Sequence, residues 1–258
     1  MIPIGISEIL KAVDGTLLWG DENGVVTNVV TDSRKAGKGS LFVPIVGERV
    51  DAHRFIPQVM QAGAGVTFSS RKDVAPAVSG CCIYVEDTLA ALQKAAAYYR
   101  SRFDIPVIGV TGSVGKTTTK EMISAVLEKK YRVVKTQGNW NSQIGVALMM
   151  FELEPETELA IFEMGMSLPG EMARLVDIAK PQTAVMTNIG VSHIGNLGSR
   201  ENIAKEKGHI VKYVGTSHDG KLYICGNGDM KQITDENVPY SLCEAKCPIC
   251  YYGTTILR

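Results

Sequence analysis

The chain has 258 residues, a length that suits two small domains better than one domain of ordinary size. It is 45% hydrophobic and 21% charged, which is typical of a folded protein with a buried core and excludes a disordered or collagen-like chain. Lys plus Arg and Asp plus Glu balance at 27 each, so no net field draws the chain to nucleic acid or to an anionic membrane.

Neither a membrane segment nor a disulfide framework is visible in the sequence. No apolar run approaches the roughly 20 residues that span a bilayer, and the N-terminus lacks the pattern of a signal peptide. The six cysteines are too few and too clustered to form a framework of disulfides in a chain of this length. We therefore expect a cytoplasmic protein with reduced thiols, no nucleic-acid partner and no membrane insertion.

Residues 1–102 are predicted to form the first domain, a small α/β unit. Residues 41–47 and 81–86 read as short strands, and residues 55–63 read as a helix that glycine stops. Asp87 is expected to cap an alanine-rich helix that runs from Thr88 to Arg100.

Residues 103–258 are predicted to form the second domain, also α/β. A short apolar strand at 106–110 is followed by a glycine-rich turn and a helix. Helical segments then alternate with strands, which favours a mainly parallel sheet with helices on both faces. The later strands are expected at 132–136, 159–163, 183–187, 221–225 and 247–252.

The glycine-rich turn has the features of a phosphate-binding loop. It reads Gly109-x-x-Gly112-x-x-Gly115-Lys116-Thr117, which differs from the standard P-loop spacing. Glycines let the backbone approach phosphate oxygens, and the N–H groups at the helix start supply partial positive charge. A lysine here reaches the β- and γ-phosphates, and the threonine hydroxyl binds Mg²⁺. A merely tight turn would carry this pattern only by coincidence.

Polar residues at the ends of the later strands are expected at the same edge of the sheet. Glu163 is either a solvated carboxylate or, facing the loop, part of an oxygen shell for Mg²⁺. Asn188 and His193 follow the next strand. A lone histidine is more often a satisfied loop or core residue than a ligand, but beside a phosphate loop and Glu163 a metal or phosphate role for His193 is equally expected.

Lys207 lies on the apolar stripe of a helix that Ser199 is expected to cap. Ile203, Ile210, Val211 and Val214 share that stripe, so the lysine is either snorkelling or buried. Burial favours the neutral amine, which takes up CO₂ to form a carbamate, an anionic oxygen ligand for Mg²⁺.

Together these motifs resemble the ATP-dependent Mur ligase family, and the resemblance covers nearly the whole chain. The segments that carry it are 31–35, 41–53, 109–119, 139–145, 163–166, 187–193 and 198–207. It implies a peptidoglycan-precursor ligase that adds D-alanyl-D-alanine to UDP-N-acetylmuramoyl-tripeptide through an acyl phosphate, with ATP and Mg²⁺. A UDP-sugar-binding domain then precedes an ATP-binding central domain.

The resemblance also implies roles for individual residues. Lys116 would stabilise the transferring phosphoryl group, with Thr117 and Glu163 on one Mg²⁺ and His193 with carbamoylated Lys207 on the other. The implied catalytic residues are Lys116, His193 and Lys207. The implied ATP-binding residues are Gly112, Ser113, Val114, Gly115, Lys116, Thr117, Thr118, Asn141, Asn227 and Asp229. The implied substrate-binding residues are Ser33, Arg34, Asp51 and His53.

The sequence leaves some alternatives open. Family members continue beyond the segment that resembles the adenosine contacts, so we expect a truncated central domain and no complete ligation by this chain alone. One alternative is a partner chain that supplies the third domain. The other hypotheses are a sibling ligase that adds a different amino acid and a non-catalytic fragment that binds UDP-sugar and nucleotide.

Cys243, Cys247 and Cys250 have the spacing of an iron–sulfur ligand set, and Cys225 or His218 could complete a zinc site. The same residues read more simply as part of a strand with a core cysteine.

Overall fold

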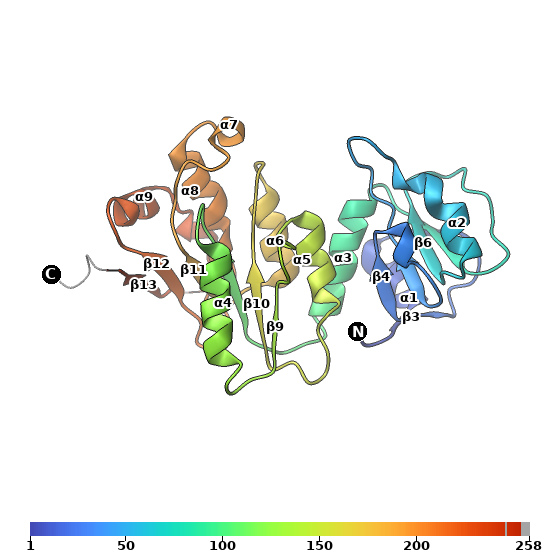
Figure 1. Cartoon of the computed structure of the whole chain (residues 1–258), viewed down its shortest axis with the longest axis horizontal. Helices are drawn as coiled ribbons and strands as arrows, with labels where there is room; N and C mark the ends of the chain where they lie inside the picture. Colours follow the sequence, from blue (N-terminus) through green and yellow to red (C-terminus); the bar gives the residue numbers. More distant parts are fainter. Residues whose placement is uncertain (246, 254–258) are drawn as a thin grey trace. The chain divides into compact units, whose positions relative to one another are not determined.

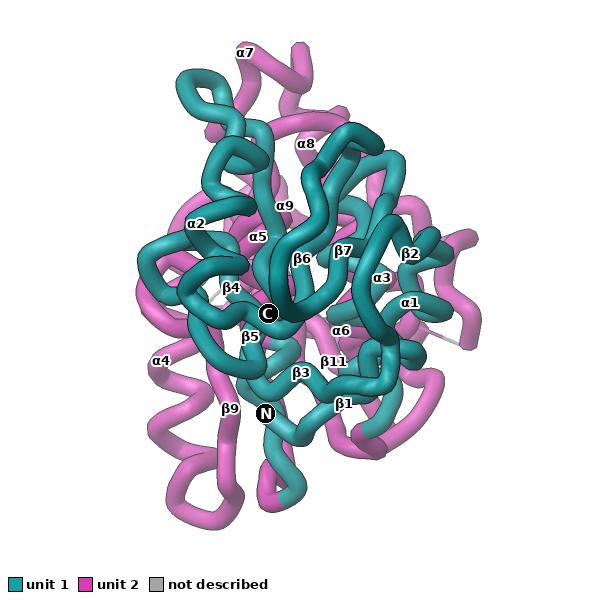
Figure 2. Tube along the Cα trace, turned by 90° about the vertical axis from the view of Figure 1, so that its right-hand side faces the viewer, with its two compact units in different colours: residues 1–102, 150–155 teal, residues 103–149, 156–258 magenta. Residues whose placement is uncertain are grey.

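The computed structural model describes residues 1–245 and 247–253. These residues form two compact units, drawn in different colours in Figure 2. Unit 1 comprises residues 1–102 and 150–155, and unit 2 comprises residues 103–149 and 156–258. None of the described helices is long and apolar enough to cross a membrane.

Unit 1 is built on a five-stranded sheet in the order β2-β7-β6-β5-β4. Strands β4 and β6 of this sheet are labelled in Figure 1. The strands β7, β6, β5 and β4 pair in parallel, and the edge strand β2 pairs with β7 antiparallel. The strands are β2 (Thr16–Trp19), β4 (Asn28–Val30), β5 (Ser40–Phe42), β6 (Val66–Ser69) and β7 (Cys81–Tyr84), with a separate antiparallel pair of β1 (Ile4–Gly5) and β3 (Val25–Val26).

Two helices of unit 1, α2 and α3, lie where the sequence predicts them, whereas α1 was not predicted. The carboxylate of Asp87 accepts hydrogen bonds from Leu89 N and Ala90 N at 2.7 and 3.0 Å, which starts the alanine-rich helix α3. Gly63, with a φ of 92°, follows the end of α2. The helices are α1 (Ile6–Val13), α2 (Ile56–Gln61) and α3 (Thr88–Arg100), with short 3₁₀ turns η1 (Ser33–Lys35) and η2 (Ala52–Phe55).

The segment 150–155 belongs to unit 1 because Tyr99 of α3 holds it there. The buried Tyr99 hydroxyl donates to Leu153 O at 2.7 Å and accepts from Ile2 N at 2.7 Å. The rings of Tyr99 and Phe151 lie 5.3 Å apart. The predicted boundary at residue 102 does not include residues 150–155 in unit 1, because the contact between Tyr99 and Leu153 joins residues far apart in sequence.

Unit 2 is a six-stranded sheet in the order β13-β12-β11-β8-β10-β9. Every neighbouring pair is parallel, which confirms the predicted mainly parallel sheet. The strands are β8 (Val107–Thr111), β9 (Val133–Lys135), β10 (Leu159–Glu163), β11 (Thr183–Met186), β12 (Leu222–Cys225) and β13 (Ile249–Tyr252).

The direction of chain travel across this sheet reverses around β8. The chain first moves to β9 on one side and then returns past β8 to β11 on the other. Because such crossovers are right-handed, α4 covers one face and the later helices the other. The helices are α4 (Lys116–Leu127), α5 (Gln143–Met150), α6 (Glu171–Ala179), α7 (Ile194–Leu197), α8 (Arg200–Gly208) and α9 (Met230–Asn237), with 3₁₀ turns η3 (His209–Val211) and η4 (Tyr240–Leu242).

One hydrophobic cluster of unit 2 forms where α4 packs on the sheet. Val110, Ile161 and Val185 from three adjacent strands are buried against Ile123 and Leu127 of that helix. In open parallel sheets a ligand crevice lies at the carboxyl ends of the strands, where the direction of travel reverses. A ligand is therefore expected at the carboxyl ends of β8, β10 and β11.

Candidate functional site

The glycine-rich turn connects β8 directly to α4, as its sequence predicts. Gly115 caps the helix with a φ of 84°, and Gly112 has a φ of 144°. A Cβ atom at Gly112 would lie 1.9 Å from Thr187 Oγ1 and 3.0 Å from Asn188 N, so a side chain there would displace these residues after β11. The turn is therefore closely packed against the end of the neighbouring strand.

The residues after β11 hold the turn in place. Asn188 Oδ1 accepts hydrogen bonds from Ser113 N and Val114 N at 3.0 and 2.9 Å. Thr187 Oγ1 donates to Val114 O at 2.6 Å, and Gly190 N donates to Ser113 Oγ at 2.9 Å. The carboxamide of Asn188 thus occupies the two amide donors at the tip of the turn.

Two lysine ammonium groups converge on a single carbonyl oxygen. Lys116 Nζ and Lys207 Nζ donate to Gly112 O at 2.9 and 3.2 Å. Lys207 is only 1% exposed. Burial, together with the charge of Lys116, lowers the pKa of Lys207 to about 8. Two cations around one neutral acceptor leave this place favourable for an anion.

Lys207 is buried rather than snorkelling, although its helix is shorter than predicted. Ser199 Oγ accepts from Asn202 N at 3.2 Å and so caps α8, as expected. The α-helix ends at Gly208 and continues only as the 3₁₀ turn η3, so Val214 lies outside it. The apolar residues of the predicted stripe are nevertheless all buried: Ile203, Ile210, Val211 and Val214.

Glu163, at the end of β10, is the centre of a hydrogen-bonded group. Thr117 Oγ1 donates to Glu163 Oε2 at 2.8 Å, and Asn141 Nδ2 donates to Glu163 Oε1 at 2.7 Å. The backbone N of Glu163 donates to Thr136 Oγ1 at 2.9 Å. Glu163 is 2% exposed, so these contacts fix its carboxylate beside the first turn of α4.

The oxygens of Thr117 and Glu163 suit Mg²⁺, which prefers hard oxygen ligands and completes its shell with water and substrate phosphate. Within residues 1–245 and 247–253, no group of three or more His, Cys, Asp or Glu side chains is arranged to hold a metal ion. Two protein oxygens leave the other positions of such a cation to water and to the phosphates of a nucleotide.

His193 and Thr118 are placed differently from the group around Glu163. His193 lies on the loop after β11, is exposed, and begins α7 with a φ of 67°. Thr118 is exposed in the first turn of α4.

The segment that resembles the adenosine contacts precedes α9 and is tied to α8. Arg200 pairs with Asp229 through both guanidinium Nη atoms, one at 2.9 Å from Oδ1, and Arg200 Nε donates to Ile189 O at 2.6 Å. The hydrogen bond from Arg200 lowers the pKa of Asp229. A cavity of about 180 Å³ opens here between α8 and α9. Asn227 packs closely on Gly253, because a Cβ atom built at Gly253 would lie 2.3 Å from Asn227 Oδ1.

In unit 1, Ser33 and Arg34 form a short turn after β4. Asp32 caps this turn by accepting from Arg34 N at 3.0 Å, and its carboxylate also accepts from Arg34 Nη2 at 2.7 Å. These hydrogen bonds lower the pKa of Asp32 to about 2. The Arg34 side chain is 85% exposed, so its guanidinium is accessible to an anionic ligand.

Asp51 and His53 follow β5 and form a relay with Ser70, which follows β6. His53 Nδ1 lies 2.6 Å from Asp51 Oδ1, and Ser70 N donates to His53 Nε2 at 3.0 Å. Nε2 therefore accepts, and the ring proton lies on Nδ1 toward the carboxylate. Asp51 also pairs with Arg71. Because the His53 side chain is 2% exposed, it supports this edge of the sheet rather than presenting itself to solvent.

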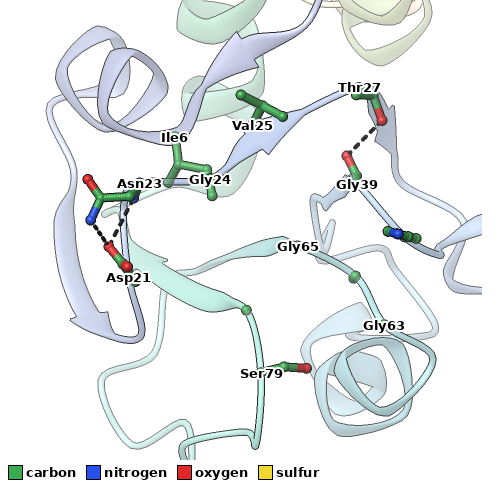
Figure 3. Close-up of a pocket in the computed structure, with 13 residues that line it drawn as sticks. Ile6, Asp21, Asn23, Gly24, Val25, Thr27, Gly39, Gly63, Gly65 and Ser79 are labelled. Atoms are coloured by element: carbon green, nitrogen blue, oxygen red, sulfur yellow. Dashed lines mark hydrogen bonds between the residues drawn. The ribbon is translucent and has the colours of Figure 1, made fainter.

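A separate cavity of about 750 Å³ in unit 1 lies at the amino ends of the strands of the same sheet (Figure 3). Figure 3 shows Asn23 hydrogen-bonded to Asp21 on one side and Thr27 bonded to Gly39 O on another. Its lining residues Thr27, Gly39, Gly65 and Gly80 precede β4, β5, β6 and β7. The predicted substrate residues follow β4 and β5, so they lie at the carboxyl ends of the strands, away from this cavity.

The cysteines near the end of the described chain do not gather into a metal site. Cys243 Sγ donates to Val214 O at 3.3 Å, and Cys250 lies in β13, as the strand interpretation predicts. Burial raises the pKa of Cys247 to about 12. No cluster of metal-binding type includes Cys225 or His218 in the part of the chain that the structure describes.

Sequence reasoning missed the roles of Thr187, Asn188 and Arg200. Asn188 and Arg200 lie in segments that stand out as motifs, but their contacts reach across strands and helices. The signal that could have found them was their position, because Asn188 lies two residues after the strand that neighbours β8 and Arg200 follows the cap of α8.

Comparisons with known proteins agree with this geometry. Residues 110–253 match the family described as Mur ligase middle domain, and residues 25–102 match the Mur ligase family, catalytic domain. A Bacillus subtilis (strain 168) protein named UDP-N-acetylmuramoyl-tripeptide–D-alanyl-D-alanine ligase is 45% identical over 191 residues, covering 74% of this chain and 42% of that protein. The Escherichia coli (strain K12) protein of the same name is 36% identical, covering 73% and 41%.

Solved structures give the same result. The crystal structure of MurF from Acinetobacter baumannii has a TM-score of 0.86 and 30% identity, covering 97% of this chain and 53% of that one. MurF ligase from Thermotoga maritima in complex with ADP has a TM-score of 0.75 and 30% identity, covering 88% and 50%. The chain thus spans about half or less of the length of these relatives. The chain belongs to the Mur ligase family.

Proposed function

We propose that unit 2 binds Mg–ATP at the carboxyl ends of β8, β10 and β11. The observation that carries this proposal is the contact of Thr117 with Glu163 at 2.8 Å, beside the two ammonium groups on Gly112 O. This contact supports the proposal because a metal–nucleotide complex requires oxygen ligands for Mg²⁺ beside cations for its phosphates. The phosphate-binding residues are Gly112, Ser113, Val114, Gly115, Lys116, Thr117 and Thr118.

Each residue has a distinct task in this proposal. Lys116 contacts the transferring phosphoryl group, and Thr117 and Glu163 hold Mg²⁺ while Asn141 fixes the Glu163 carboxylate. When bound, Mg²⁺ neutralises phosphate charge, which suits a reaction that depends on positioning and electrostatics. Nucleotide phosphates would replace Asn188 as acceptors for the Ser113 and Val114 amides.

Asn227 and Asp229 are proposed to contact the adenosine moiety. Their segment borders the cavity of about 180 Å³ between α8 and α9. Arg200 fixes the Asp229 carboxylate and links it to the loop after β11. The base and the phosphates would therefore be held by parts of one connected framework.

Lys207 is proposed to be carbamoylated and, with His193, to hold a second cation. Burial makes its amine neutral at mildly alkaline pH, and a neutral amine reacts with CO₂ to give a carbamate and a proton. The carbamate anion would also relieve the repulsion between the two lysines. His193 lies on an exposed loop, so it would have to turn toward Lys207 when the nucleotide binds.

Unit 1 is proposed to bind the UDP-sugar substrate at the carboxyl edge of its sheet. The exposed Arg34 and the neighbouring Ser33 offer a cation and a hydroxyl for the diphosphate. Asp51 and His53 hold the adjacent loop through Ser70 and so support the substrate site from behind.

The proposed reaction is the addition of D-alanyl-D-alanine to UDP-N-acetylmuramoyl-tripeptide. ATP phosphorylates the terminal carboxylate of the peptide, and the dipeptide amine displaces phosphate to form the amide bond. The names of relatives that are 36% and 45% identical support this choice of substrates. A ligase named for 2,6-diaminopimelate is only 15% identical with a TM-score of 0.63, which shows the shared fold and no more.

Calorimetry with ATP and Mg²⁺ tests the nucleotide site. Lys116→Ala should weaken binding strongly, whereas Lys129→Ala, at an exposed position after the same helix, should bind like the unchanged chain. Equal affinities for the unchanged chain and Lys116→Ala would contradict the assignment.

The reaction itself is tested with ATP, Mg²⁺, UDP-N-acetylmuramoyl-tripeptide and D-alanyl-D-alanine. Phosphate release that requires the tripeptide substrate supports acyl-phosphate formation, and UDP-linked pentapeptide shows complete ligation. Binding of both nucleotides without phosphate release would favour the alternative of a non-catalytic binding protein. Product formed with another amino acid in place of the dipeptide would favour a sibling ligase.

A further inference from the structure

Lys120 is a buried lysine for which the proposed reaction has no use. It lies one helical turn after Lys116 in α4, on the side that packs against β9 and β10, and its side chain is 1% exposed. A buried ammonium group is costly unless it is paired and hydrogen-bonded. The partners of Lys120 therefore indicate what it holds.

Lys120 has two partners: the carboxylate of Glu121, which forms an ion pair with it, and the carbonyl of Thr136, which accepts a hydrogen bond from it. Glu121 Oε1 lies 2.8 Å from Lys120 Nζ, and hydrogen bonds from Lys120 and then Lys135 lower the pKa of Glu121. Lys120 Nζ also donates to Thr136 O at 2.6 Å. The ammonium group thus connects α4 to the end of β9.

Thr136 passes this contact on to Glu163. It is 1% exposed, and its backbone N donates to Ile161 O of β10 at 3.0 Å. Its hydroxyl accepts from Glu163 N at 2.9 Å. The loop that begins after Thr136 carries Asn141, which contacts the Glu163 carboxylate at 2.7 Å.

We propose that Lys120 is a positioning residue for Glu163, and through it for the divalent cation of a bound nucleotide. Helix α4 reaches Glu163 by two routes: directly through Thr117, and through Lys120 and Thr136. Without Lys120 the buried Thr136 carbonyl loses its donor, and the loop that carries Asn141 is free to shift. The role in cation binding rests on the function proposed above, whereas the link from Lys120 to Glu163 does not.

Hydrogen exchange of the Glu163 amide, without any nucleotide, tests that link. Lys120→Met keeps the length of the side chain and removes its charge and donors, Lys120→Arg keeps both, and Lys129→Met is the exposed control. The Glu163 amide should exchange faster in Lys120→Met, with Lys120→Arg closer to the unchanged chain and Lys129→Met equal to it. Unchanged exchange in Lys120→Met would overturn the proposal.

Nucleotide affinity with Mg²⁺ and with a chelator tests the role in cation binding. Lys120→Met should lose about 10–100-fold in affinity for Mg–ADP, the usual effect of removing an outer-shell partner of a metal site. Its affinity for ADP without Mg²⁺ should equal that of the unchanged chain. An equal loss under both conditions, or no loss with Mg²⁺, would overturn a role in positioning the cation.

A second pair of variants serves if Lys120→Met fails to fold. Thr136→Val removes the hydroxyl that accepts from Glu163 N, and Thr136→Ser keeps it. Thr136→Val should show the same loss of Mg²⁺-dependent affinity and Thr136→Ser should not; equal behaviour of the two would overturn the proposal. If the unchanged chain binds no nucleotide, the proposed function fails, and the exchange measurement still decides the link from Lys120 to Glu163.

Discussion

Lys116 and Lys207 come from different helices, yet their ammonium groups donate to the same oxygen, Gly112 O, at 2.9 and 3.2 Å. One lysine begins the helix after the turn, and the other is buried in α8. The two cations therefore share one acceptor in the turn, and a change in the backbone path at Gly112 would alter the contacts of both.

Gly112→Ala should abolish nucleotide binding. Its φ of 144° and the 1.9 Å approach of a Cβ to Thr187 Oγ1 leave no room for a methyl group, so the turn must change its path. Gly195→Ala is a matched control in unit 2, because nothing lies within 4 Å of a Cβ built there. Calorimetry with Mg–ATP should show binding by the control alone, and binding by Gly112→Ala would contradict the packing argument.

Carbamate formation on Lys207 should increase as the pH rises through about 8, where its amine becomes neutral. ¹³C NMR with labelled bicarbonate near pH 8 should show a carbamate signal that is lost in Lys207→Met. Lys205→Met, at an exposed position on the same helix, should keep the signal. A signal that persists in Lys207→Met would place the modification on another residue.

Burial of Lys207 should also appear in the pH dependence of stability in CO₂-free buffer. Its folded-state pKa of about 8 lies below the ordinary value of 10.5, so between these values the unfolded chain binds more protons. The free energy of unfolding of the unchanged chain should therefore rise relative to Lys207→Met between pH 8 and 10.5. The full change is on the order of 3 kcal/mol. Urea denaturation at pH 7 and pH 10 measures it, and a constant difference would contradict the lowered pKa.

Exposed and buried residues at the carboxyl edge of unit 1 should respond differently to substitution. His53→Ala leaves Asp51 and the Ser70 amide without their partner, so it should destabilise unit 1 by about 1–3 kcal/mol. Arg34→Ala should leave stability nearly unchanged and weaken binding of the UDP-sugar substrate. Thermal unfolding and calorimetry separate the two effects. Loss of stability in Arg34→Ala with normal binding would contradict the assignment of Arg34.

Local signals in the sequence were sufficient for much of the fold. The cap at Asp87, the alternation of strands and helices, and the three glycines before Lys116 each depend on neighbours in the chain, and the structure shows the elements that they predict. The apolar stripe left Lys207 either snorkelling or buried, and only the structure shows that it is buried, on a helix α8 that ends earlier than the stripe suggests.

Contacts between distant segments could not be predicted in the same way. The order of the strands decides that Asn188 faces Ser113 and that Thr136 faces Glu163, and the sequence does not state that order. The burial of His53 was missed for the same reason, since Ser70 reaches it from the next strand. Likewise, nothing local shows that Leu153 returns to Tyr99.

The Mg²⁺ dependence of nucleotide affinity in Glu163→Gln tests the central claim most directly. Glutamine keeps the size of the side chain and removes its charge, while Glu156→Gln serves as an exposed control in the same unit. We predict that Mg²⁺ raises the affinity for ADP in the unchanged chain and in the control but not in Glu163→Gln, and that all three bind alike in a chelator. An undiminished effect of Mg²⁺ in Glu163→Gln would contradict the assignment of Glu163 to the cation site.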